Sequence, residues 1–466
     1  MNDLADRSAS ELRALIAARD VSVVDIVGAS LDRVERLNPT LNAIVTLNPR
    51  ALDDARDLDR RLARGEDPGL LCGLPAGIKD VTPVAGLRTT FGSRMYADHV
   101  PPHDALVVKR LRSAGAVILG KTNCPEFAAG GNTFNEVFGR TRNPWDPAKS
   151  AGGSTGGGAA ALATGMIALA EGTDLGGSLR IPASFCGLVG LRPSVGLVPT
   201  HPSDWVWDTL QVTGPMARTA ADVALMLQAV AGPSDYSPLA QPTAARDFVA
   251  AVRAGPRRGL RIGYCPDVAG IGIDPGIERA CRDAAFALTD IGAEVEAIDL
   301  DLSSGRPAFL ALRGLWFVAQ MFPRLDRQDQ FGPNVAGNVR AGLGTTTTEI
   351  AAAEDVRGRI WHRFRELFAR FDHLLTPCMA VPPFPVEQNY PASIAGRPMA
   401  TYIDWLAPTF LLSLTGLPVV SVPCGLDGGT RGMPVGLQIV GKPQGEESVL
   451  ALAAAIQELR PIERPR

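Results

Sequence analysis

Residues 150–182 place the strongest constraint on what this chain can fold into. The stretch reads SAGGSTGGGAAALATGMIALAEGTDLGGSLRIP and contains two serines, Ser154 and Ser178, which are framed by glycines and separated by an apolar segment of small residues. A glycine lets the backbone come close to a reacting atom and adopt angles that other residues resist. Two such serines in one short stretch indicate a functional site around which the rest of the chain is organised.

The rest of the chain alternates between helical and strand-like patterns, which is typical of α/β architecture. Residues 1–65 repeat apolar positions at three- and four-residue spacing, so we expect N-terminal helices there. Residues 66–230 should form a catalytic core, and residues 303–370 a variable helical insertion. No strong linker interrupts the chain, although Pro, Ser and Ala accumulate over residues 232–245. We therefore predict one large α/β domain over residues 1–466.

Composition argues against several classes of function. The 466 residues carry 46 basic and 49 acidic side chains, a net charge of −3, so no basic excess points to nucleic acid. No charge-free apolar run reaches the ~18 residues of a membrane-spanning helix. The N-terminal MNDLADRSASELRAL lacks the basic-then-apolar plan of a secretory signal. We expect a cytoplasmic protein that binds neither membrane nor nucleic acid.

Cysteine and histidine usage argues against a metal or redox centre. The 7 cysteines are scattered and never form a CxxC pair, which favours buried free thiols over disulfides or zinc. His99 and His103 are the only close pair among the 5 histidines, and the prolines between them predict a loop. We expect no metal site and no cofactor.

The run GTDLGGSLR has the elements of an acyl-transfer site. Hydrolysis of an amide requires a nucleophile, a base, and donors aimed at the oxyanion that forms. Ser178 offers a hydroxyl, and a tight turn from Leu175 to Ser178 would bring backbone N–H groups to one point. The alternative is a glycine loop that only ends a strand. The spacing leaves both interpretations open.

The base is harder to assign, because none of the histidines lies in a motif that would bring it to these serines. Lys79, in the apolar run GLPAGIKD, is the leading substitute. A free lysine has a pKa of about 10.4, so burial or a like charge would have to bring this pKa down to near neutrality. The alternative is a surface ion pair with the adjacent Asp80, which is the commoner meaning of such a dipeptide.

A different nucleophile is suggested by residues 152–156, which match the GxSxG elbow of α/β-hydrolases and would assign attack to Ser154. That elbow requires a strand directly before the serine. The preceding RNPWDPAKSAG is polar and interrupted by prolines. A phosphate-binding loop is also disfavoured, because no GK[ST] follows the glycines.

Several segments resemble the amidase signature family. They include GLPAGIKD, KTNCPEFA, NPWDPAKSAGGSTGGGAAALATGM, EGTDLGGSLRIPASFCGLVGLRPSVGLVP and GPMARTAADVALML, followed downstream by LLTP, LTGLPVVSVPCG and MPVGLQIVG. The resemblance spans most of the chain and weakens only over about 232–260 and 303–370. It implies a central mixed β-sheet flanked by α-helices, and an amide hydrolase.

The resemblance also implies roles for individual residues. Lys79 falls on the family's catalytic lysine, Ser154 on its bridging serine with a cis peptide bond, and Ser178 on its acyl-forming nucleophile. In that scheme neutral Lys79 draws a proton through Ser154 from Ser178, and water later hydrolyses the acyl-enzyme. The implied oxyanion donors are the backbone N–H groups of Leu175, Gly176, Gly177 and Ser178. The implied loop supports are Thr155, Asp174 and Arg180.

Departures from the family pattern bear on the branch to which the chain belongs. Thr155 stands where many members carry a second serine, and Leu175 replaces the commoner threonine of GTDTGGS. Ile181 stands where tRNA-dependent amidotransferase subunits usually carry glutamine after the arginine. This favours a stand-alone hydrolase over an amidotransferase-type subunit that works only with partner chains.

Aromatic residues lie in the segments that the family uses for its substrate pocket, although ordinary core positions are the alternative. Such a pocket would suit a bulky or aryl amide, and aryl carbamates (urethanes) or esters share the same acyl chemistry. The expected partners are this small molecule and water, and a homodimer is the expected assembly. The candidate pocket residues are Phe127, Gly130, Gly131, Asn132, Trp205, Trp207, Trp316, Phe317, Phe322, Tyr402 and Trp405.

Overall fold

A mixed sheet of 11 strands runs through the computed structural model, which describes residues 4–429 and 432–465. The strands lie in the order β1 (Ile44–Leu47), β3 (Val117–Thr122), β2 (Pro75–Lys79), β6 (Leu169–Asp174), β8 (Val212–Ala217), β7 (Val189–Arg192), β14 (Val419–Leu426), β15 (Pro434–Val440), β11 (His373–Pro377), β9 (Arg261–Tyr264) and β10 (Glu294–Ala297). Two further two-stranded sheets pair β4 (Phe134–Asn135) with β5 (Gly139–Arg140) and β12 (Ser393–Ile394) with β13 (Arg397–Pro398).

Parallel pairing is confined to two parts of the sheet. Strand β2 is parallel to both β3 and β6, and β9 is parallel to both β10 and β11. The strands between these two parts are antiparallel to their neighbours. The prediction of a large α/β domain with a central mixed sheet is confirmed.

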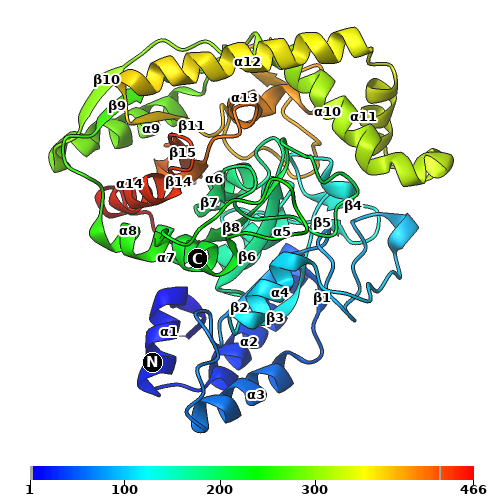
Figure 1. Ribbon diagram of the computed structural model, residues 1–466, viewed down its shortest axis with the longest axis vertical. Coiled ribbons are helices and arrows are strands. Elements are labelled where there is room, and N and C mark those ends of the chain that lie inside the picture. The colour runs from blue at the N-terminus through cyan, green and yellow to red at the C-terminus, as the bar shows by residue number, and fades with distance from the viewer. Residues whose placement is uncertain (1–3, 430–431, 466) are drawn as a thin grey trace.

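Helices cover the sheet and extend beyond it at both ends of the molecule. Figure 1 shows α1–α3 at one end and α10–α12 at the other. The α-helices are α1 (Ala9–Ala18), α2 (Val23–Leu41), α3 (Ala51–Ala63), α4 (Leu106–Ser113), α5 (Gly156–Ala163), α6 (Arg180–Cys186), α7 (Ala220–Val230), α8 (Phe248–Ala254), α9 (Pro275–Ala287), α10 (Gly305–Met321), α11 (Pro333–Leu343), α12 (Thr347–Arg370), α13 (Ala407–Ser413) and α14 (Glu446–Leu459). None of the helices in the described part of the chain is long and apolar enough to cross a membrane.

The first two helices begin at local signals. The side chains of Ser8 and Ser22 each accept a hydrogen bond from the backbone N–H three residues later. The side chains of Glu11 and Asp25 in turn accept hydrogen bonds from the backbone N–H groups of these serines, so both helices begin with a capping box. Residues 1–65 also contain β1, which pairs with β3 at the edge of the sheet. The helical pattern did not predict this strand, because only pairing with β3 stabilises so short a segment as a strand.

Residues 303–370 contain α10, α11 and α12, and α12 alone is 24 residues long. Helix α10 packs against both α11 and α12. All 7 cysteines are buried free thiols, as their scattered spacing predicts.

The strand order brings the two glycine-framed serines to one edge of the sheet. Strands β2 and β6 are parallel neighbours, so their carboxyl ends, Lys79 and Asp174, lie at the same edge. Helix α5 packs beside both strands through small residues. A Cβ atom on Gly157 of α5 would lie 2.3 Å from the backbone nitrogen of Asn123, so only glycine permits this close approach.

Candidate active site

Lys79, the last residue of β2, is completely buried with polar but uncharged partners at its amine. Its Nζ lies 2.7 Å from Ser154 Oγ and 2.9 Å from Thr173 Oγ1. Burial lowers the pKa of Lys79 to about 8, although negative groups nearby, among them Glu171 and Asp174, oppose this shift. A fraction of the Lys79 amine is therefore neutral near neutral pH, and this fraction grows as the pH rises to the pKa of about 8.

The surface Lys-Asp pair that the sequence left open is absent, because Lys79 is 0% and Asp80 1% exposed. The Asp80 carboxylate instead accepts a hydrogen bond from the backbone of Thr90 at 3.1 Å and lies 4.0 Å from Lys121 Nζ. Lys79 thus points to the serines, and Asp80 belongs to a separate buried cluster.

Ser154 is buried directly before α5, and its peptide bond with Gly153 is cis. The residues before it, 141–153, form turns, bends and isolated bridges. The strand that a nucleophile elbow requires is therefore missing, which argues against Ser154 as the attacking group. Its hydroxyl is instead the hydrogen-bond partner of Lys79.

Ser178 lies in the loop between β6 and α6 and is half-buried. Both Ser178 and Ser154 line the same narrow cavity. The backbone N–H of Thr155 donates to the carbonyl of Ser178 at 3.2 Å, which ties the two serine segments together. Among the described residues no hydrogen bond joins the two serine hydroxyls, so the structure forms the Lys79–Ser154 half of a relay.

The backbone donors of the loop are not equivalent. The N–H of Gly177 donates to Asp174 Oδ1 at 2.8 Å and is therefore engaged within the loop. The N–H groups of Leu175, Gly176 and Ser178 have no acceptor within the described residues, and these three residues line the cavity. The structure corrects the expected set of oxyanion donors, because Gly177 cannot also direct its N–H at a substrate.

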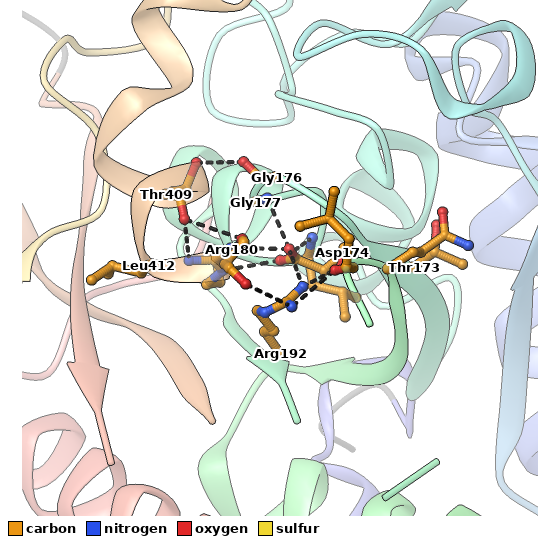
Figure 2. Close-up of polar contacts among 12 residues, drawn as sticks. Thr173, Asp174, Gly176, Gly177, Arg180, Arg192, Thr409 and Leu412 are labelled. Atoms are coloured by element: carbon orange, nitrogen blue, oxygen red, sulfur yellow. Dashed lines mark hydrogen bonds and ion pairs between the residues drawn. The ribbon is translucent and has the colours of Figure 1, made fainter. Parts of the chain in front are cut away.

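Asp174 holds this loop together from the inside (Figure 2). Its carboxylate accepts hydrogen bonds from the backbone of Gly177 and Leu179 and from the guanidinium of Arg180, at 2.8 to 3.2 Å. Arg192 is a second buried cation beside the same carboxylate. Burial alone would raise the pKa of Asp174, but the two guanidinium groups outweigh burial and hold it well below its usual range.

The loop is also fixed from outside. Thr409 on α13 donates its hydroxyl to the carbonyl of Gly176 at 2.6 Å, and Arg180 donates to the carbonyl of Thr409 at 3.0 Å. Within residues 4–429 and 432–465 the hydroxyl of Thr155 has no hydrogen-bond partner, and it packs where Gly172 leaves room, since a Cβ on Gly172 would lie 2.6 Å from it. Asp174 and Arg180 therefore contact the loop through their side chains, whereas Thr155 contacts it through its backbone N–H, and a supporting role for its hydroxyl stays a prediction.

The expected pocket residues fall into two groups, of which the first lines cavities. Phe127, Gly130, Trp316, Phe317 and Tyr402 surround the cavity at Ser178, which has a volume of about 30 Å³. An adjoining cavity of about 300 Å³ shares Phe127 and Trp316 and is bounded by Trp205. A substrate with its carbonyl at Ser178 would extend into this larger space.

The second group does not reach either cavity. Trp405 is completely buried, stacks on Phe185 with ring centroids 6.0 Å apart, and fills the space beside Gly131, so both residues belong to the core. Asn132 is buried, and its side chain donates to the carbonyls of Val386 and Gln388. The expectation that Gly131, Asn132 and Trp405 line the pocket is corrected accordingly.

Two further aromatic residues are surface residues. Trp207 is 62% exposed and Phe322 is 72% exposed, and neither lines either of the two cavities near Ser178. Trp207 follows Trp205 by two positions in an irregular loop, and Phe322 follows the end of α10. Trp207 lies in an irregular loop and Phe322 begins a 3-10 helix, so closeness in sequence to a pocket residue did not place either side chain in the pocket.

Sequence reasoning missed two residues of the site. Thr173, next to last in β6, contacts the amine of Lys79 through its hydroxyl, and the run GTDLGGSLR contains this residue without indicating its role. Arg313 lines the cavity from α10, together with Phe309, Trp316 and Phe317. Their spacing of three and four positions is a helical pattern that would have indicated one common face.

Known proteins are similar to this chain over nearly its whole length. A family described as Amidase matches residues 25–450. An acylamidase of Rhodococcus erythropolis is 36% identical over 462 residues, covering 97% of this chain and 95% of the relative. A glutamyl-tRNA(Gln) amidotransferase subunit from Carboxydothermus hydrogenoformans is also 36% identical, over 479 residues, covering 97% of this chain and 96% of that relative.

A solved structure is similar over nearly the whole length. A bacterial aryl acylamidase, described as an amidase signature enzyme, matches with a TM-score of 0.91 at 29% identity, covering 98% of this chain and 96% of that chain. The family match, the relatives and the shared fold together show that this chain belongs to the amidase signature family and is a hydrolase of amide C–N bonds.

Proposed function

We propose that this chain is a stand-alone serine amidase in which Ser178 is the nucleophile, Ser154 relays a proton, and neutral Lys79 is the base. The observation that carries the proposal is the 2.7 Å contact between Lys79 Nζ and Ser154 Oγ, made by a completely buried lysine. No histidine in the described part of the chain lines the cavity at Ser178, so this amine is the proposed proton acceptor.

The reaction proceeds in two acyl-transfer steps. Ser178 Oγ attacks the carbonyl carbon while its proton passes to Ser154 and the proton of Ser154 passes to Lys79. The oxyanion meets the N–H groups of Leu175, Gly176 and Ser178. The proton returns to the amine nitrogen, the C–N bond breaks, and an ester to Ser178 remains. Water, deprotonated along the same path, then releases the acid.

The lining of the two cavities supports a bulky or aryl amide as substrate. Aromatic side chains form part of the wall around Ser178, among them Phe127, Phe309, Trp316 and Phe317. A flat ring fits between such walls with little loss of conformational freedom. Aryl carbamates and esters offer a similar acyl group and are proposed as further substrates. A cytoplasmic location and a homodimer stay predictions.

An amidotransferase subunit is the second candidate, because the relative from Carboxydothermus hydrogenoformans is as similar as the acylamidase. Ile181 favours the stand-alone enzyme. It follows Arg180, where amidotransferase subunits usually carry glutamine, and it lines the cavity with an apolar side chain. Obligate co-purification with partner chains and no turnover by the single chain would support the amidotransferase assignment instead.

The test uses purified single chains and a panel of primary amides, anilides, carbamates and esters. Ser178→Ala, Ser154→Ala and Lys79→Ala should each lose nearly all amide hydrolysis while remaining folded. The exposed Ser113 and Lys109 offer matched controls, Ser113→Ala and Lys109→Ala, which should keep full activity. An activity-based serine probe should label Ser178. A label mapped to Ser154, or full turnover by Lys79→Ala, would overturn the assignment.

A further inference from the structure

A buried arginine lines the cavity beside Ser178. Arg313 is 6% exposed and comes from the face of α10 that also carries Phe309, Trp316 and Phe317. Among the described residues that line this cavity, it is the only one with a charged side chain. Aromatic side chains pack together without a cation, so packing alone does not explain the charged side chain of Arg313 in this cavity.

The partners of Arg313 within the protein are all neutral. Its guanidinium donates to Asn338 Oδ1 and, at 2.7 Å, to the hydroxyl of Tyr402. It also lies over the rings of Phe317 and Tyr402, at 4.6 and 5.4 Å from their centroids. No carboxylate in the described part of the chain forms an ion pair with it. Burying a cation without a counter-charge is unfavourable, so this arrangement keeps a positive charge unneutralised.

Donors remain available at this place. A guanidinium has five N–H groups, and only two contacts to oxygen are made. The Nε atom of Arg313 has no acceptor among the described residues. This atom is also not fully enclosed by the atoms around it. The hydroxyl of Tyr402 accepts from both Arg313 and Asn338, which leaves its own proton to donate elsewhere. The cavity therefore offers hydrogen-bond donors and a positive charge together.

We propose that Arg313 and Tyr402 bind a carboxylate of the substrate, so the preferred substrates are amides with a carboxylate a few bonds from the scissile carbonyl. The short distance is required because Arg313, Tyr402 and Ser178 line one cavity of about 30 Å³. A carboxylate pairs with arginine through two parallel hydrogen bonds, which a neutral group cannot match. This substrate class rests on the function proposed above.

The same lining disfavours free α-amino acid amides such as glutamine. Their ammonium group would need an acidic partner, and no acidic side chain lines the cavity within the described residues. Monoamides of short dicarboxylic acids carry the carboxylate without the ammonium. They are therefore the substrates that the site fits.

The test compares two p-nitroanilides of similar shape, the succinyl anilide and the 4-methylpentanoyl anilide, in which an isopropyl group replaces the carboxylate. The wild-type chain should prefer the succinyl anilide by on the order of 10- to 100-fold in kcat/KM, the effect of a charge-assisted hydrogen bond. Arg313→Met should abolish this preference, mainly through KM, and Arg313→Lys should restore part of it. Tyr402→Phe should reduce the preference less.

Arg340→Met is the matched control, because Arg340 is exposed on α11 outside the cavity, and it should keep the preference. Equal kcat/KM values for the two anilides in the wild type, or an unchanged ratio in folded Arg313→Met, would overturn the proposal. Failure of the wild type to hydrolyse either anilide would contradict the proposed function instead.

Calorimetry measures binding of the two anilides and so tests the carboxylate proposal without requiring their hydrolysis. The Ser178→Ala chain should bind the succinyl anilide more tightly than its neutral counterpart, and adding Arg313→Met should remove the difference. Equal binding of both anilides by Ser178→Ala would overturn the carboxylate site even if hydrolysis is observed.

Discussion

Lys79 shows how single contacts set the chemistry of the site. A lysine surrounded by carboxylates would stay protonated, whereas the amine of Lys79 meets the hydroxyls of Ser154 and Thr173. Because burial disfavours the charged form, the pKa of Lys79 falls to about 8. In the proposed mechanism the base is thus produced by burial of Lys79 away from water rather than by a second catalytic group.

This pKa predicts the pH dependence of activity. Protonated Lys79 cannot accept the proton of Ser154, so kcat/KM should fall about tenfold per pH unit below the pKa of about 8 and reach a plateau above it. The measurement is kcat/KM for a neutral anilide over about pH 6 to about pH 10. A flat profile through this range, with the protein folded throughout, would contradict a lysine base.

At the scale of elements, the loop between β6 and α6 depends on a backbone conformation that glycine adopts readily. Gly177 has a φ of +120°, and a Cβ atom there would lie 2.3 Å from Thr409 Oγ1. The neighbouring N–H groups of Gly176 and Ser178 are the oxyanion donors of the proposed mechanism. A shift of this loop would therefore affect both stability and rate.

Gly177→Ala should destabilise the protein by about 1 to 3 kcal/mol, since it adds strain and a steric clash. The rate should fall by on the order of 100-fold, as when an oxyanion donor is displaced. Urea unfolding and kcat measure the two effects. Gly358→Ala is the control, because Gly358 lies within α12 with no atom near the added Cβ, and it should be stabilising by about 0.5 to 1 kcal/mol. Wild-type kcat in Gly177→Ala would contradict the role of the loop.

The Asp174–Arg180 ion pair supports the same loop and predicts a second effect. Both side chains are 0% exposed, so removing one partner leaves a buried charge with less compensation. Arg180→Met should lower the free energy of unfolding by about 3 to 5 kcal/mol. Arg282→Met breaks an exposed pair with Glu278 on α9 and should cost at most about 1 kcal/mol. Equal losses in the two variants, measured by urea unfolding, would show that burial of the pair has no such effect.

At the scale of the whole molecule, helix α1 joins the core through apolar side chains such as Leu12 and Ile16 and through buried polar contacts. The Asp222 carboxylate on α7 accepts hydrogen bonds from the backbone of Ala9 and Ser10 and from the hydroxyl of Ser10, at 2.8 to 3.2 Å. These donors belong to the first turn of α1, whose N–H groups lack partners within the helix. One side chain thus anchors α1 to a helix more than 200 residues later, as separations of 212 and 213 positions show.

Asp222→Ala should release α1 before the rest of the molecule unfolds. We expect amide hydrogen exchange in α1 to accelerate and the free energy of unfolding to fall by about 1 to 3 kcal/mol, the cost of leaving buried donors unsatisfied. Asp283→Ala, at an exposed position of α9, is the matched control. Unchanged exchange in α1 would show that apolar packing alone holds this helix.

The sequence by itself determined the features that depend on neighbouring residues. The glycines around Ser154 and Ser178 act over a few positions, and the family motifs follow one another in order along the chain, so both patterns are visible in the sequence. From them follow the α/β class, the family, and the candidate residues Lys79, Ser154 and Ser178.

Only the tertiary structure decided which groups face the cavity. Trp316 lines the cavity, whereas Trp405 fills the core. The N–H of Gly177 donates to Asp174, whereas the N–H of Gly176 does not. Arg313 meets Tyr402 from a helix 89 positions away. A local sequence pattern indicates which residues are buried but not which residues they contact, because long-range packing brings together elements that are remote in sequence. The proposed specificity of this enzyme therefore rests on contacts that its motifs do not encode.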